Sequence, residues 1–219
     1  MRLTFAAASL GCALVALTGC GSLQDETAPT PAITVTHTAT PSPSTTTEAV
    51  AKAFTEPGAS VAADGTLVLP ALAASADGTQ TEVAIEYSLG DVVEAELEDL
   101  AGVLSDDAIA TIRFQYPVFV HYTATVSGPA VPSGYTVTEP AAMTGITTTG
   151  DEASAPVGDG SPALCEPLDV EELTAQSTAE GCWPLLVSTD GDLAALQYAG
   201  TFKGSAADYM TAPVTWKVG

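Results

Sequence analysis

The sequence predicts an all-β protein whose strands form an antiparallel sandwich, and three observations support this fold class. From about residue 60 onward, short runs rich in Val, Leu, Thr and Tyr follow one another. Gly, Asp and Pro separate these runs, as turn residues separate strands. No helical pattern alternates with the runs, which argues against a parallel α/β sheet. The expected domain, residues 60–219, spans about 160 residues and can bury one adequate core.

The first hairpin is expected around the turn dipeptide Asp77-Gly78. Thr66–Leu69 precedes this dipeptide and Glu82–Tyr87 follows it, and both runs contain β-branched and large apolar residues. The pattern therefore predicts two antiparallel strands joined by this turn.

The segment Asp91–Leu104 fits two patterns. Its first apolar residues alternate with glutamates, as in a half-exposed strand, whereas its leucines and Val93 also fit a helical stripe. The β-branched pair Val92-Val93 and the neighbouring β-prone runs favour a strand.

The longest strand is expected at Ile112–Val126. One face would carry Tyr116, Val118, Val120, Tyr122, Ala124 and Val126, and the other Phe119, His121, Thr123 and Thr125. Pro117 has no backbone donor for a sheet ladder, so this strand is expected to begin at a sheet edge or to bend there.

Five further runs are candidate strands: Tyr135–Thr138, Thr144–Thr149, Leu185–Ser188, Leu193–Tyr198 and Val214–Val218. Asp190-Gly191 separates two of them and is interpreted as a hairpin turn. Many short strands with frequent turn signals predict an antiparallel sandwich of the immunoglobulin-like kind.

The N-terminus contains the three parts of an export signal. Arg2 supplies a basic start, Leu3–Leu17 is apolar, and Thr18-Gly19 are small residues before Cys20. The apolar stretch is shorter than the roughly 20 residues that span a bilayer. Its end, Leu17-Thr-Gly-Cys20, resembles the lipobox of bacterial lipoproteins. The resemblance implies that a signal peptide, residues 1–19, is removed, that Cys20 receives a diacylglycerol, and that this lipid anchors the chain to the outer face of the cytoplasmic membrane.

Residues 20–59 are predicted to form a disordered tether between this lipid and the domain. Thr, Pro, Ser and Ala dominate the segment, so it has too little apolar bulk to pack. About 35 flexible residues would have a reach near 30 Å. The density of hydroxyl groups is compatible with O-glycosylation, which composition alone leaves open.

The chain is strongly acidic. After the predicted cleavage it would carry 27 acidic residues against 4 basic ones, a net charge of −23. Such a surface repels phosphate polymers and anionic headgroups, so neither nucleic acid nor direct lipid-surface binding is expected. The chain contains no Asn and little Lys, a bias typical of GC-rich genomes such as those of actinobacteria.

Two cysteines, Cys165 and Cys182, would remain after Cys12 leaves with the signal peptide and Cys20 is acylated. An even pair in an exported protein predicts a structural disulfide. The spacing is too wide for a redox C-x-x-C motif, and no further Cys or His stands nearby to complete a zinc site. The bulky Trp183 is expected to cover the bond.

The sequence predicts no catalytic residue, metal site or cofactor. It contains neither a G-x-S-x-G nucleophile elbow nor an S-x-x-K motif. Of its histidines, His37 falls in the tether and His121 in the long strand, where a structural or surface role is expected. Calcium ligands could come from Asp190-Gly-Asp192 and Asp106-Asp107, but no EF-hand spacing is present.

The paired carboxylates and the aromatic residues are both expected to have structural roles. The pairs Glu94/Glu96/Glu98, Asp106-Asp107, Asp151-Glu152 and Glu171-Glu172 are interpreted as solvated faces. Two carboxylates facing each other across a cleft would instead support glycoside hydrolysis. The aromatic residues Trp183, Trp216, Tyr198, Phe119 and Tyr122 are expected in the core, in preference to a platform for carbohydrate stacking.

Several segments of the C-terminal half follow a common pattern: Tyr116–Gly128, Cys165, Gly181-Cys182 leading into Leu185–Val187, Leu196–Tyr198 and Ala212–Trp216. Together they resemble a family of actinobacterial exported lipoproteins of unknown function that have an immunoglobulin-like β-sandwich. The resemblance covers about Asp91–Gly219 and implies that the two cysteines pair and that a Trp-containing strand closes the chain. The sequence Val126-Ser-Gly128 departs from the Asn-Gly type of turn expected there. The family brings no catalytic residues.

These observations predict a membrane-anchored lipoprotein whose sandwich is a non-catalytic binding or accessory module for an unknown envelope protein or glycan. The alternative is a cell-envelope hydrolase whose carboxylates converge only in the fold. An enzyme requires a concave cleft, whereas a module is expected to offer an exposed apolar or aromatic patch.

Overall fold

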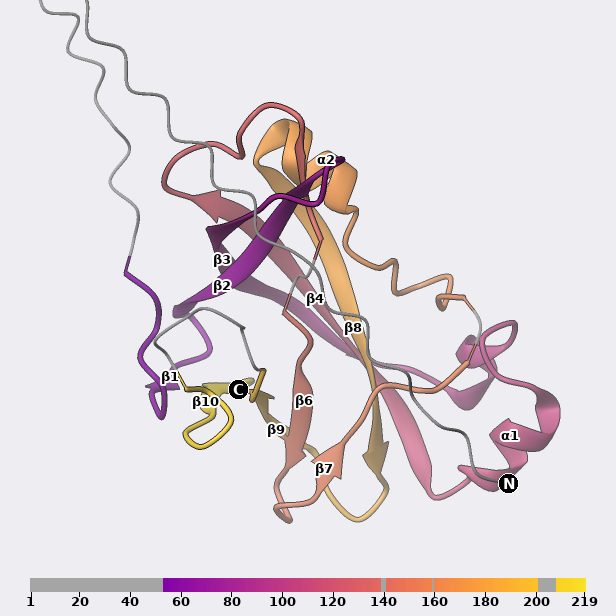
Figure 1. Cartoon of the computed structure of the whole chain (residues 1–219). Helices are drawn as coiled ribbons and strands as arrows, with labels where there is room; N and C mark the ends of the chain where they lie inside the picture. The colour runs from indigo at the N-terminus through magenta and orange to yellow at the C-terminus, as the bar shows by residue number, and fades with distance from the viewer. Residues whose placement is uncertain (1–52, 139–140, 159, 201–207) are drawn as a thin grey trace, which may run out of the picture. The chain divides into compact units, whose positions relative to one another are not determined.

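The computed structural model describes residues 53–138, 141–158, 160–200 and 208–219 (Figure 1). The predicted signal peptide 1–19, the acylation site Cys20 and most of the predicted tether lie outside these residues. The described residues all belong to one compact unit, Thr46–Gly219.

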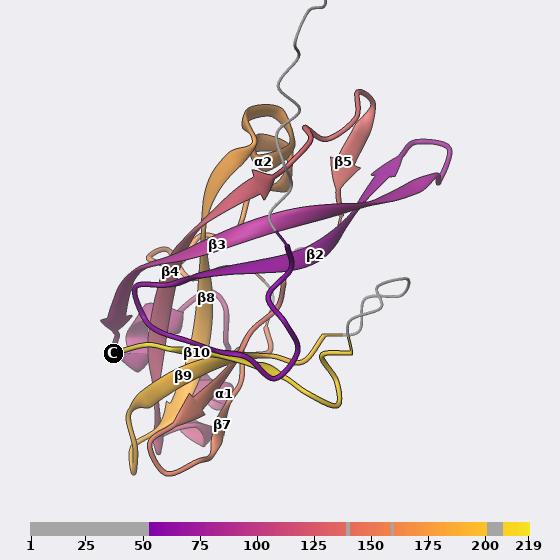
Figure 2. The ribbon, with the colours of Figure 1, turned by 90° about the vertical axis from the view of Figure 1, so that its left-hand side faces the viewer.

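The described chain forms two five-stranded sheets in a sandwich-like arrangement, and in Figure 2 the long indigo and magenta strands of one sheet lie above the yellow strands of the other. The long sheet has the order β5 (Tyr135–Val137), β2 (Thr66–Ser75), β3 (Gln80–Glu94), β4 (Gln115–Ser127) and β8 (Thr178–Ser188). The short sheet has the order β1 (Ser60–Val61), β10 (Val214–Lys217), β9 (Leu193–Tyr198), β6 (Thr144–Thr147) and β7 (Glu152–Ala153). All pairings are antiparallel except that of β1 with β10. The all-β prediction is confirmed.

The main core lies between the inner faces of the two sheets. Its aromatic residues are Tyr87, Tyr122, Trp183, Tyr198, Tyr209 and Trp216. The Tyr122 and Trp183 rings stack with centroids 3.7 Å apart, and Trp183 Nε1 donates to the Ala141 carbonyl at 3.3 Å. Burial raises the pKa of the Tyr87 hydroxyl well above its usual value, and this hydroxyl accepts from the Ala141 amide at 2.9 Å. The expectation that Trp183, Trp216, Tyr198, Phe119 and Tyr122 are core residues is confirmed.

The predicted hairpin between β2 and β3 is confirmed. Its turn is stabilised by Asp77, whose Oδ1 accepts from the Ser75 hydroxyl and, at 2.9 Å, from the Thr79 amide. Gly78 has a φ of 84°, a conformation that favours glycine.

The long predicted strand is β4, and its inward face is the predicted one. Val118, Val120, Tyr122, Ala124 and Val126 are buried, and Tyr116 is partly buried. β4 lies inside the long sheet between β3 and β8, but its first residues extend past the β3 ladder, so the strand begins at a local edge, as one of the two expectations for Pro117 had it. Pro117 is tolerated there because β3 has its last partner at Val118, which pairs with Glu94. The missing donor of Pro117 therefore falls just beyond that ladder.

The hairpin predicted at Asp190-Gly191 is wrong. The turn joins β8 to β9, but β8 pairs with β4 in the long sheet and β9 pairs with β6 and β10 in the short sheet. The Gly191 amide donates to the Ser188 carbonyl at 3.1 Å, so a tight turn is present. It carries the chain from one sheet to the other, which a local turn signal does not reveal.

The strand expected over Asp91–Leu104 ends at Glu94. A 3₁₀ helix, η1 (Leu97–Leu100), follows, and the Asp99 carboxylate accepts from the Glu96 amide at 2.9 Å to cap it. Two helices that the sequence analysis did not predict, α1 (Asp106–Thr111) and α2 (Val170–Gln176), lie in the connections before β4 and β8. α2 has 7 residues, and no helix in the described part of the chain has the length and apolarity to cross a membrane.

Candidate functional site

The candidate site is a hollow of about 690 Å³ beside the outer face of β4 and β8. The segment 163–169 and α2 form its other walls. We call it the β8 hollow. The side chains that give it chemical character are His121, Glu166, Asp169, Glu172, Gln176 and Glu180.

The alternation of side chains along two paired strands builds the sheet wall of the β8 hollow. His121 and Thr123 point away from the main core because Val120, Tyr122 and Ala124 point into it. The partners across the ladder are Cys182 for His121 and Glu180 for Thr123. This wall therefore presents an imidazole, a hydroxyl and a carboxylate from adjacent strands.

A β-bulge lies directly opposite His121 on the other neighbour of β4. The β3–β4 register passes from Leu89–Tyr122 to Val92–Val120, so two residues, Gly90 and Asp91, oppose one. A Cβ on Gly90 would lie 3.3 Å from the His121 carbonyl oxygen, which makes glycine the residue that allows this close approach. The bulge locally bends β3 beside the wall of the hollow.

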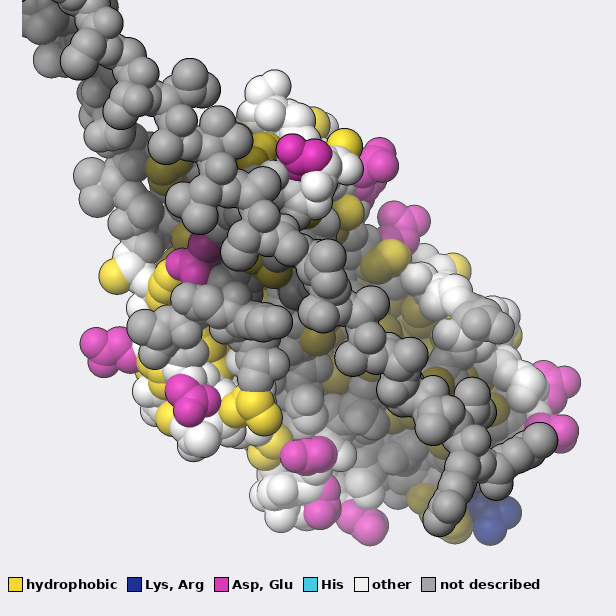
Figure 3. Space-filling model, viewed as in Figure 1, with side chains coloured by type: hydrophobic (Ala, Val, Ile, Leu, Met, Phe, Trp, Pro, Cys, Tyr) yellow, Lys and Arg dark blue, Asp and Glu magenta, His cyan; other side chains and the backbone are white. Residues whose placement is uncertain are grey.

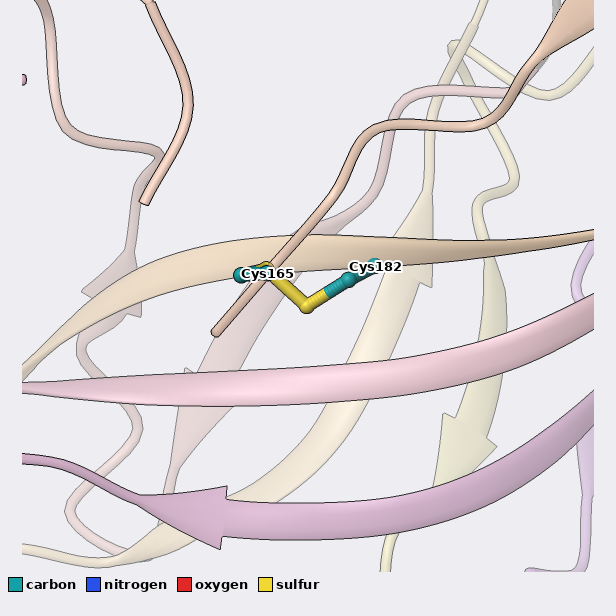
Figure 4. Close-up of a disulfide and its surroundings, with 2 residues drawn as sticks. All are labelled: Cys165 and Cys182. Atoms are coloured by element: carbon teal, nitrogen blue, oxygen red, sulfur yellow. A yellow bond between two sulfur atoms is a disulfide. The ribbon is translucent and has the colours of Figure 1, made fainter. Parts of the chain in front are cut away.

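The disulfide between Cys165 and Cys182 fixes the second wall to the first (Figure 4). Their Cα atoms are 5.1 Å apart, and the predicted bridge is confirmed. Leu164 and Glu166 flank Cys165, and Gly181 precedes Cys182; all three line the hollow. The disulfide thus holds the segment that carries Glu166 against the β8 strand.

The expectation that Trp183 covers the disulfide is wrong. Successive residues of a strand point to opposite faces, so Trp183 enters the main core while Cys182 points outward. A separate small core covers the bond instead, with Leu100, Phe119 and Leu186 buried around both cysteines. The helix η1, which the sequence analysis did not predict, supplies Leu100 to this cluster.

The third wall is α2, whose N-terminus is capped by Asp169. The Asp169 Oδ1 accepts from the backbone amides of Glu171 at 2.9 Å and Glu172 at 3.0 Å. Glu172 in turn accepts from the Gln176 side-chain amide at 3.2 Å, one helical turn along. The sequence Asp169-Val-Glu-Glu172 was an available helix-start signal, because Asp is a favoured N-cap and acidic residues favour the first turn.

The charge of the β8 hollow is one-sided. Glu166, Asp169, Glu172 and Glu180 line it, and no lysine or arginine does so among the residues that the structure describes. Acidic side chains elsewhere are scattered over the surface (Figure 3). The hollow differs from this background because its carboxylates come from three separate elements and surround one concavity.

The structure does not gather the carboxylates that the sequence groups in pairs. Of these pairs only Glu171-Glu172 contributes to the β8 hollow, through Glu172. The calcium candidates Asp190 and Asp192 lie in a turn, where the Asp192 amide donates to the Thr148 hydroxyl at 3.1 Å. Among the described residues, no group of three or more His, Cys, Asp or Glu side chains is placed to hold a metal ion.

A second hollow, of about 530 Å³, lies at the start of β3 and the end of β4. Phe54, Val83, Pro129, Ala130 and Pro132 give it a mainly apolar lining, with Glu82 as its acidic residue. It has no histidine and fewer polar side chains, Thr81, Glu82 and Ser127, so the β8 hollow is taken as the candidate for a specific polar site.

Comparison of the chain with protein-family models, with curated proteins and with solved structures found no match. The case for the candidate site therefore rests on the geometry of its residues.

Proposed function

We propose that this protein is an extracytoplasmic lipoprotein, anchored by a diacylglycerol on Cys20, whose sandwich is a non-catalytic binding module. The observation that carries the binding role is the β8 hollow, a concavity of about 690 Å³ within the size range of ligand sites. A sheet, a disulfide and a helix fix its walls. Such a preformed cavity limits the ordering cost of binding.

The aromatic residues that could have formed a platform for ligand stacking are buried in the core. Trp183, Trp216, Tyr122 and Phe119 are all less than a tenth exposed. A ligand therefore cannot stack on them without opening the core, and the polar hollow takes the place of the expected aromatic patch in this proposal.

We propose further that the sandwich is of the immunoglobulin-like kind. The two largely antiparallel sheets and the chain crossings between them support this. One feature departs from the antibody pattern: the disulfide joins a loop to β8 on the outer face and does not cross the core between the sheets.

A hydrolase of the cell envelope is the second candidate, and the convergence of carboxylates on the β8 hollow favours it. Glu166, Glu172 and Glu180 come together beside His121 only in the fold. The binding role accounts better for the same groups, because Asp169 is already used as a helix cap and Glu172 accepts from Gln176. General acid–base catalysis needs a carboxyl group whose proton can move to substrate.

Turnover assays separate the two functions. The mature protein should give background rates with ester, peptide and glycan substrates, and Thr123→Trp, which fills the hollow from β4, should abolish ligand binding. Turnover that falls at least a hundredfold in His121→Ala or Glu180→Gln, with the melting temperature unchanged, would establish the hydrolase instead.

The anchor has its own test. Intact mass and detergent partitioning of the wild type should show a lipid on Cys20, and Cys20→Ala should lack it and lose membrane association. A mature wild-type mass without lipid, in protein released to the medium, would contradict the anchor. The binding role of the domain would then still be tested by the turnover and binding assays described above.

A further inference from the structure

We propose that the start of β3, with the apolar hollow of about 530 Å³ beside it, binds a segment of the same chain, Ile33–Thr36. The bound segment adds a short strand to the long sheet and closes part of the predicted tether into a loop. This surface is separate from the β8 hollow, and the docking does not depend on a lipid at Cys20.

The first observation is that β4 ends while β3 still has residues without a partner. The last pair of the β3–β4 ladder is Ala84 with Ser127. Gln80–Val83 therefore have partners on β2 but none on the β4 side among the residues that the structure describes. Gly128, with a φ of 102°, turns the chain away from the ladder, and Pro129 has no amide to continue it. The start of β3 is thus a free sheet edge.

The register shows which backbone groups of this edge are free. The Ser75 amide donates to the Thr79 carbonyl at 2.9 Å, so the odd-numbered residues at the start of β3 direct their backbone groups towards β2. The even-numbered Gln80 and Glu82 therefore direct their amides and carbonyls to the other side, where the described part of the chain supplies no partner. Both residues are exposed. An added strand satisfies such an edge.

The second observation is the apolar hollow that lies beside the same edge. Phe54, Val83 and three residues of the β4–β5 connection, Pro129, Ala130 and Pro132, line it. Glu82 is the one charged residue in its described lining. Alternate side chains of a strand point to the same face, so a strand paired with the edge also places apolar side chains in the hollow.

The chain itself identifies the occupant. The described residues begin at Ala53, and both Ala53 and Phe54 line the hollow, so the preceding chain starts at the site. Within residues 20–52, Ile33-Thr-Val-Thr36 is the one run in which β-branched apolar residues alternate with polar ones. This run is as long as the free edge, and its two apolar side chains share one face.

The chain between the segment and the hollow is long enough to connect them. Residues 37–52 provide 16 residues, and a flexible chain of that length spans about 20 Å. A segment linked in this way acts at an effective concentration on the order of millimolar, which favours docking of even a short strand. In the docked state only residues 21–32 separate Cys20 from the domain. The proposed lipid anchor therefore holds the docked domain closer to the membrane.

The site variant removes the apolar side chains of the segment and leaves the domain unchanged. Ile33→Ser/Val35→Ser takes away both groups that enter the hollow. The matched control, Leu23→Ser/Val50→Ser, removes two apolar side chains from elsewhere in residues 20–52. The melting temperature of the domain should be the same in both variants and in the wild type.

The experiment measures amide hydrogen exchange by NMR in the mature protein in detergent. In the wild type and the control variant, the Gln80 and Glu82 amides should be protected. In the site variant they should exchange at least tenfold faster. The Thr81 and Val83 amides, which face β2, serve as the internal reference and should exchange at unchanged rates. A synthetic peptide with the sequence Pro-Ala-Ile-Thr-Val-Thr should restore protection in the site variant.

Unprotected Gln80 and Glu82 amides in the wild type would overturn the proposal, because the edge would then be open. Protection that the site variant keeps would also overturn it, since another group would then cover the edge. Equal acceleration in the site and control variants would show that the segment is not recognised specifically. Protection that rises with protein concentration would show that the segment of a second copy fills the hollow, which would overturn docking within one chain. The ligand assays of the β8 hollow are independent of all these outcomes.

Discussion

The two faces of the β4–β8 pair are built in different ways. The inner face is a dense core in which Tyr122 stacks on Trp183, and it follows from alternation along each strand. The outer face carries the β8 hollow and the disulfide, and it depends on how the stretch 163–181, which holds a loop, α2 and the start of β8, packs beside β4. Alternation thus determines which residues are buried, while the packing of the stretch 163–181 on β4 determines the site.

The inner and outer faces of the β4–β8 pair are also expected to differ in how much they contribute to the free energy of unfolding. Removing an inner side chain leaves a cavity in a packed core, whereas an outer polar side chain can be replaced with little loss of stability. Stability and ligand binding are therefore expected to respond to different substitutions on the same two strands.

The largest effect on the free energy of unfolding is expected from Trp183→Ala. The indole is 8 % exposed, stacks on Tyr122 and donates to Ala141, so its loss should cost about 3–5 kcal/mol. Glu180→Gln, on the outer face of the same strand, should change stability by less than about 0.5 kcal/mol. Urea unfolding of both variants tests this, and similar losses would show that the two faces are not energetically distinct.

Loss of the disulfide should have the next largest effect, and it should affect both properties. Cys165→Ser/Cys182→Ser opens a loop with a sequence separation of 17, which should cost about 3 kcal/mol. The near-ultraviolet circular dichroism of the stacked Trp183 should persist, because the main core lies on the other face. Ligand binding should fall, since the segment carrying Glu166 is released. Unaltered binding in the folded double variant would show that the disulfide does not shape the hollow.

Gly181→Ala should have an intermediate effect, because this glycine lies where the two faces meet. A Cβ there would be 2.6 Å from the Tyr122 hydroxyl oxygen and 3.0 Å from the Leu168 Cβ, so the Tyr122 ring must shift. Overpacking of this kind costs about 1–3 kcal/mol. Tyr122→Leu removes both close ring atoms, the hydroxyl oxygen and Cζ at 2.7 Å, so the double variant should lose less stability than the two single losses added together. Strict additivity in thermal unfolding would contradict this contact.

The inner face could be predicted from the sequence almost completely, and the outer face only in part. The buried face of β4 and the β2–β3 hairpin follow from local pattern, as does the pairing of Cys165 with Cys182. The sheet exchange at Asp190-Gly191 does not, because a turn signal does not specify which strands pair. The partner of a strand depends on contacts that are distant in sequence.

The β8 hollow was not predicted, although its carboxylates all lie in the short stretch 166–180, because the sequence does not show how this stretch folds back beside β4. Glu166, Asp169 and Glu180 belong to a loop, a cap and a strand, and the disulfide and α2 both hold the loop beside β8. His121 was considered as a site residue, but its alternation pattern predicts only that it faces outward. The cap at Asp169 was the one local signal that could have located the helix wall.

The smallest expected effect concerns the β2–β3 turn, which lies on neither face. The Ser75 hydroxyl, followed by the Thr79 amide, lowers the pKa of Asp77 to about 2. Because the folded-state pKa lies below the ordinary value of 3.8, the turn contributes its stabilisation above that value and loses it as pH falls towards about 2.

Ser75→Ala removes the largest cause, so carboxyl NMR titration should show the pKa of Asp77 moving back towards 3.8. The pKa of Asp208, which the Thr211 hydroxyl and amide lower, serves as the internal control and should stay in place. An unchanged Asp77 midpoint in the Ser75→Ala variant would show that the hydroxyl does not hold this turn. Equal movement of both midpoints would show a general change in surface charge, which the scattered acidic groups of this chain could produce.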